Sequence, residues 1–155
     1  MTAPVGPRIL KGTLLLGGVP PLLSGLFAMF FADSYLGFID EGVANIFDSR
    51  AYPLVLVIGS LQGGDAFVAG ASRIFVAYWG NVRLMIAFAV VGVLHSAFEL
   101  WLLPTQLLSW CQTEHLCSDA FRAEVWAFVG LHAVLIAGFA AGTVIALVRP
   151  SNLRG

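Results

Sequence analysis

Four stretches of this chain are apolar enough and long enough to cross a membrane. A helical span needs about 20 mostly apolar residues. The stretches cover about residues 9–32, 53–72, 84–104 and 125–148. We therefore expect an all-α fold, a bundle of four transmembrane helices in which residues 1–155 form a single membrane domain.

Two of these stretches contain residues that are unusual in a span. The first is interrupted by Gly17-Gly18 and by Pro20-Pro21, which free backbone carbonyls, so we expect a kink that neighbouring helices shelter. The second holds Gln62, Gly63, Gly64 and Asp65. Because polar side chains avoid lipid, we expect the polar face of this helix to lie inside the bundle.

The basic residues indicate the orientation of the chain. Six of the eight Lys and Arg residues fall on one side of the predicted bundle, namely Arg8, Lys11, Arg73, Arg83, Arg149 and Arg154. Such residues gather on the cytoplasmic side of membrane proteins. We expect both termini on that side and loops 33–52 and 105–124 on the outer or lumenal side. The membrane would be a bacterial inner membrane or a eukaryotic organelle membrane.

Both outer loops carry a pattern. In the first, apolar residues recur at helical spacing and polar residues take the other face, which predicts a short amphipathic helix in the interface plane or against a neighbouring subunit. The apolar positions are Leu36, Ile39, Val43, Ile46 and Phe47. In the second, Cys111 and Cys117 are spaced for a disulfide on an oxidising side. His115 adds too few ligands for zinc, so we predict no metal site.

The composition of the chain limits the classes of molecule that it is expected to bind. The chain is 59% hydrophobic and 11% charged, with a net charge of −1. A soluble domain has roughly 25% charged residues, and the net charge gives no reason to expect binding of nucleic acid. The expected partners are membrane lipids and other membrane protein subunits.

Four ionisable residues fall within the predicted spans: Asp65, His95, Glu99 and His132. His95 and Glu99 are four residues apart and share a helix face. Glu99 would pair with His95 or reach the outer interface. Asp65 lies near the middle of the membrane, where we favour a protonated carboxyl bonded to another helix. The alternative is a proton or ligand path that Asp65 and Gln62 line.

His95 and His132 are predicted at matched depth on adjacent antiparallel helices, roughly 10–14 Å below the outer face. This is the geometry of bis-histidine ligation of haem b or of a chlorophyll-type pigment. We favour interhelical hydrogen bonds between the two helices. Gly138-x-x-x-Gly142 on the fourth span has the spacing of close helix approach.

Two sterol-related families share residues with this chain. Gly92-x-x-His95-x-x-x-Glu99-x-Trp101 resembles the helix of the emopamil-binding sterol isomerases, and that resemblance implies catalysis by His95 and Glu99. A longer set of matches resembles the four-span ergosterol-biosynthesis accessory protein family, which implies a scaffold without chemistry of its own. These matches are Ser49-Arg50-Ala51-Tyr52-Pro53, Ile58-Gly59-Ser60-Leu61 and His95-Ser96-Ala97-Phe98-Glu99-Leu100.

No residue pattern completes a catalytic site around His95 and Glu99. The sequence has no nucleophile motif, no HExxH and no Gly-rich phosphate loop. We therefore predict a non-enzymatic accessory or scaffold subunit of a larger membrane protein complex, which packs through small-residue helix faces. The alternatives are a haem- or pigment-binding subunit for electron transfer or light harvesting, and a sterol-type isomerase.

Overall fold

The computed structural model describes residues 5–31, 34, 52–109, 112 and 119–148. They form α1 (Val5–Leu16), α2 (Val19–Phe30), α5 (Tyr52–Trp79), α6 (Val82–Leu102), η2 (Leu103–Leu108) and α8 (Asp119–Val148). No strand occurs among these residues, which confirms the all-α class. Three segments are long and apolar enough to cross a membrane: Val5–Phe30, Val82–Gln106 and Arg122–Val148.

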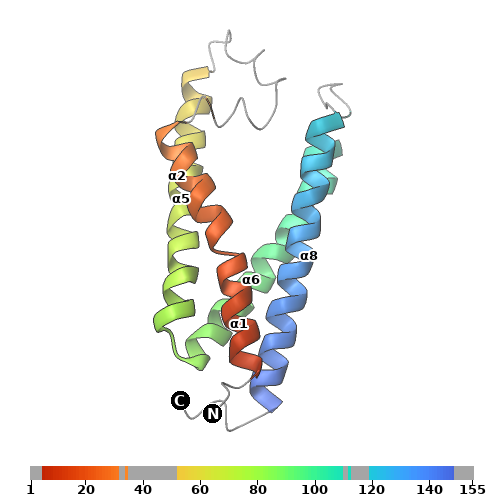
Figure 1. Ribbon diagram of the computed structural model, residues 1–155. Coiled ribbons are helices and arrows are strands. Elements are labelled where there is room, and N and C mark those ends of the chain that lie inside the picture. The colour runs from red at the N-terminus through yellow and green to blue at the C-terminus, as the bar shows by residue number, and fades with distance from the viewer. Residues whose placement is uncertain (1–4, 32–33, 35–51, 110–111, 113–118, 149–155) are drawn as a thin grey trace.

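The helices form two pairs that diverge from a common end. Figure 1 shows α2 beside α5 in one arm, α6 beside α8 in the other, and α1 between the arms where they converge. α1 contacts α5, α6 and α8. The buried core lies at this converging end, with Leu10 and Leu14 of α1 fully buried. Residues from α5, α6 and α8 complete it: Val76, Ala77, Met85, Ala89, Leu135, Phe139 and Ala146.

Glycines bring the backbones of α2 and α5 into contact. A Cβ on Gly25 would lie 2.5 Å from the Gly63 carbonyl oxygen, and one on Gly70 would lie 2.6 Å from the Gly18 carbonyl oxygen. The two glycines of each helix are seven residues apart, which is two helical turns, so they fall on one face. The pair is therefore antiparallel and too close for side chains at these positions.

The predicted close-approach motif on α8 packs against α1 of the same chain. A Cβ on Gly138 would meet the Thr13 side chain, with Oγ1 at 2.5 Å, and one on Gly142 would meet Leu10, with Cδ2 at 2.9 Å. One turn further, Gly6 faces the backbone of Ala146. The first and last described helices thus meet at the same end of the bundle.

Helix bounds differ from the sequence prediction at three places. α5 continues seven residues past Ser72, so Arg73 lies within a helix and not in a loop. α8 begins at Asp119, and the chain stays helical through Pro104 as η2, so much of the predicted loop 105–124 is helical. Proline has no N–H and clashes with the carbonyl four residues back, and the wider π-type turn of η2 accommodates it.

The first span is broken where predicted. α1 ends at Leu16 and α2 begins at Val19, with Gly17 and Gly18 between them. The predicted amphipathic helix around residues 36–48 and the predicted Cys111–Cys117 disulfide, with His115, lie outside the described residues.

Candidate functional site

A side chain from α5 holds the break between α1 and α2. In an unbroken helix the N–H of residue 21 would donate to the carbonyl of residue 17, but Pro21 has no N–H. The Nη1 of Arg73 donates instead to the Gly17 carbonyl oxygen, at 2.6 Å. The N–H of Gly17 keeps its helical bond to the Thr13 carbonyl, at 2.9 Å. Arg73 thus replaces the donor that Pro21 lacks.

The break also lies against α8. A Cβ on Gly17 would lie 3.2 Å from Cδ2 of Leu135 and 3.6 Å from Nη1 of Arg73. Three parts of the chain therefore converge at Gly17, and Arg73 is half-buried where they meet.

His95 of α6 and His132 of α8 lie together, as their matched depth predicted. Their ring centroids are 5.9 Å apart and the planes cross at 64°, an edge-to-face contact. His95 is exposed and His132 is half-buried. Nδ1 of His132 is buried and has no hydrogen-bond partner in the described part of the chain. The interhelical hydrogen bond that the sequence favoured does not involve this nitrogen.

The imidazole of His132 lies within the electrostatic reach of three other side chains, those of Glu99, His95 and Arg73. These four residues come from α5, α6 and α8. Glu99 is half-buried, and neither a hydrogen bond nor an ion pair joins its side chain to His95 among the described residues. In that part of the chain no three His, Cys, Asp or Glu side chains are placed to hold a metal ion.

A haem or pigment macrocycle fits this arrangement poorly. A metal bound by both imidazoles would lie between the rings, with the macrocycle separating α6 from α8. One turn from His95, however, α6 and α8 are packed together, because Gly92 lies against the ring of Phe139, where a Cβ would approach Cε2 to 2.5 Å. Ligation would require these helices to separate, so bis-histidine ligation remains a prediction.

The polar face of α5 is not buried in the way the sequence suggested. Gln62 and Asp65 are exposed, and neither forms an ion pair among the described residues. The reason is that glycines, not polar groups, mediate the contact with α2. Gly63 is buried against α2, whereas nothing lies within 4 Å of a Cβ on Gly64.

The structural role of Arg73 was not predicted from the sequence, where this residue only helped to indicate the orientation of the chain. The signal for its structural role was present in Pro20-Pro21, because the carbonyls that these prolines free need a donor from another helix. The donor itself could not be identified from the sequence, because Arg73 is 56 residues away from Gly17.

Comparison with protein-family models, with curated proteins and with solved structures gives no match to this chain. The likeness of His95, Glu99 and Trp101 to the sterol isomerases and the longer likeness to the accessory family therefore remain predictions.

Proposed function

We propose that the protein is a four-span, non-enzymatic accessory subunit of a larger membrane protein complex. The observation that carries this proposal is the exposure of Gln62 and Asp65 midway along α5. Asp65 is 13 residues from the first residue of α5 and 14 from the last. A carboxyl at that depth is unfavourable in lipid by roughly 3 kcal/mol, so a helix of another subunit that covers it would be favoured.

The fourth span in this proposal is α5. Its 28 residues are enough to cross a bilayer. It also contacts α2 closely at Gly25–Gly63 and Gly18–Gly70, and α2 belongs to an apolar segment of spanning length. If Val5–Phe30 crosses the membrane, the antiparallel α5 must lie at the same depth.

The proposed orientation places the converging end of the bundle on the cytoplasmic-type side. Arg8, Lys11 and Arg83 lie at that end, whereas Asp119 and Glu124 lie at the start of α8, near the other end. This distribution agrees with the gathering of basic residues on the cytoplasmic side.

The proposed contact face is Gln62, Asp65 and Ala69, all exposed on α5 at helical spacing. The GxxxG face of α8 is not available to another subunit, because α1 already packs against Gly138 and Gly142. The accessory role therefore rests on the polar face of α5 and not on small-residue faces. A scaffold of this kind needs no pocket or catalytic group.

Co-purification tests the proposal. The tagged chain is extracted gently from its own membrane as wild type, as Asp65→Leu and as Val91→Ala, a control at an exposed apolar position on α6. We expect the wild type and Val91→Ala to bring the same partner proteins. Asp65→Leu should lose them while the chain itself is still inserted and folded. A wild-type protein that runs as an uncomplexed monomer would overturn the proposal.

A further inference from the structure

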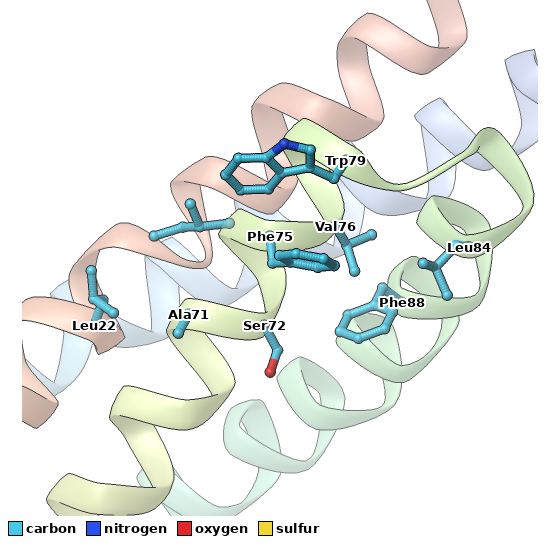
Figure 2. A pocket seen from close by; sticks show the side chains of 9 residues that line it. Leu22, Ala71, Ser72, Phe75, Val76, Trp79, Leu84 and Phe88 are labelled. Carbon is cyan, nitrogen blue, oxygen red and sulfur yellow. The ribbon is translucent and has the colours of Figure 1, made fainter.

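An apolar groove of about 670 Å³ runs along the last turns of α5, between residues 71 and 79 and therefore beyond Gln62 and Asp65 in the helix. Its walls come from three helices: Leu22 of α2, Ala71, Phe75 and Trp79 of α5, and Leu84 and Phe88 of α6. Figure 2 shows Phe75 and Trp79 on one side and Leu84 and Phe88 on the other. Ser72 is the one polar side chain in this lining. The volume of the groove lies in the usual range of small-molecule sites, roughly 300–1,000 Å³.

The groove ends at the converging end of the bundle. Trp79, the last residue of α5, is 71% exposed, and its ring contacts Phe75 with centroids 5.2 Å apart. Exposed indoles of this kind collect at the level of lipid headgroups. The groove therefore extends from the hydrocarbon region to the membrane surface, which is the course of an acyl chain.

Two basic residues, Lys11 and Arg83, lie near the end of the groove. Arg83 is exposed and precedes the lining residue Leu84. Lys11 lies with Nζ 4.3 Å from the centroid of the Tyr78 ring, and Tyr78 contacts Trp79. Among the described residues, this end of the bundle carries no acidic side chain. The positive charge at this end of the bundle is complementary to an anionic phospholipid, in which no headgroup amine neutralises the phosphate.

We propose that the groove binds one acyl chain of an anionic phospholipid whose headgroup is held by Arg83. The apolar walls would take the chain, Trp79 would lie beside the glycerol region, and the guanidinium would donate to the phosphate. The site is independent of the proposed accessory role, because the contact face at Gln62, Asp65 and Ala69 lies elsewhere on α5.

Native mass spectrometry of the purified full chain tests this site. Phosphatidylglycerol and phosphatidylcholine with the same acyl chains are titrated separately. We expect one phosphatidylglycerol to bind roughly fivefold more tightly than phosphatidylcholine, the difference that one cation at a membrane surface provides. Arg83→Gln should abolish this preference, whereas Arg122→Gln, an exposed cation at the other end of the bundle, should retain it.

The acyl-chain part of the site is tested with a second pair of variants. Ala71→Trp fills the groove, and we expect it to weaken binding of both lipids at least tenfold. Ala140→Trp, at an exposed position of α8, which does not line the groove, should leave binding unchanged. Equal binding of the two lipids by the wild type, or unchanged binding by Ala71→Trp, would overturn the proposal. So would a crosslink from position 75 to another protein in the native membrane. If Ala71→Trp does not fold, the Arg83→Gln comparison decides.

Discussion

Arg73 donates a hydrogen bond of 2.6 Å to the carbonyl oxygen of Gly17, 56 residues earlier in the chain. Pro21 leaves this carbonyl without a helical donor, so a charged group from α5 stabilises the break between α1 and α2. The break in turn lets α1 pack on α8 while α2 packs on α5. One hydrogen bond therefore joins α5 to the break between α1 and α2.

We expect Arg73→Met to lower the free energy of unfolding by about 2 kcal/mol, because it leaves a half-buried carbonyl without its charged donor. In a Pro21→Ala background the same substitution should have a smaller effect, since the N–H of residue 21 can then donate to Gly17. A double-mutant cycle measured by denaturation in mixed micelles gives both values. Equal effects in the two backgrounds would contradict the assigned role. Arg8→Met, at an exposed position, is the control.

The adjacent glycines of α5 should respond in opposite directions to alanine. A Cβ on Gly63 would lie 2.8 Å from the Cβ of Ala28 and 2.9 Å from the Gly25 carbonyl oxygen, whereas nothing lies within 4 Å at Gly64. We expect Gly63→Ala to destabilise the protein by roughly 1–3 kcal/mol. Gly64→Ala should stabilise it by roughly 0.5–1 kcal/mol, because alanine loses less backbone conformational entropy than glycine when the helix forms. Unfolding in mixed micelles measures both, and equal values would argue against the close contact of α2 and α5.

Replacement of His132 by phenylalanine tests the structural interpretation of the histidine pair. Phe keeps the edge-to-face contact with His95 and removes the buried Nδ1 that has no hydrogen-bond partner in the described part of the chain. We expect His132→Phe to change stability by less than about 1 kcal/mol, and His132→Ala to lower it by more. A large loss in the Phe variant would instead indicate that the imidazole nitrogens bind something.

Absorption spectra test the cofactor alternative independently of stability. We expect the protein extracted from its own membrane to show no Soret or chlorophyll-type band, because the close packing of Gly92 on Phe139 leaves no space for a macrocycle between α6 and α8. A band that both His95→Ala and His132→Ala abolish would make these residues ligands and would require α6 and α8 to separate around the group.

The sequence was sufficient for features that depend on local pattern. Hydropathy predicted the helical class, Gly17-Gly18 with Pro20-Pro21 predicted the broken first span, and helical rise predicted the meeting of His95 and His132. Features that depend on which faces pair could not be predicted in this way. Gly63 and Gly64 are indistinguishable in sequence, yet only Gly63 contacts α2. The exposure of Asp65 and the role of Arg73 follow from that pairing and from the divergence of the arms.

Site-specific photocrosslinking in the native membrane tests the proposed accessory role most directly. A photoreactive residue is placed at position 69, beside Gln62 and Asp65 on the proposed contact face, or at position 91, an exposed apolar position of α6. We predict a defined protein adduct from position 69 and none from position 91, and loss of the adduct when Asp65→Leu is added. The absence of a protein adduct from position 69, or the same adducts from both positions, would contradict the account.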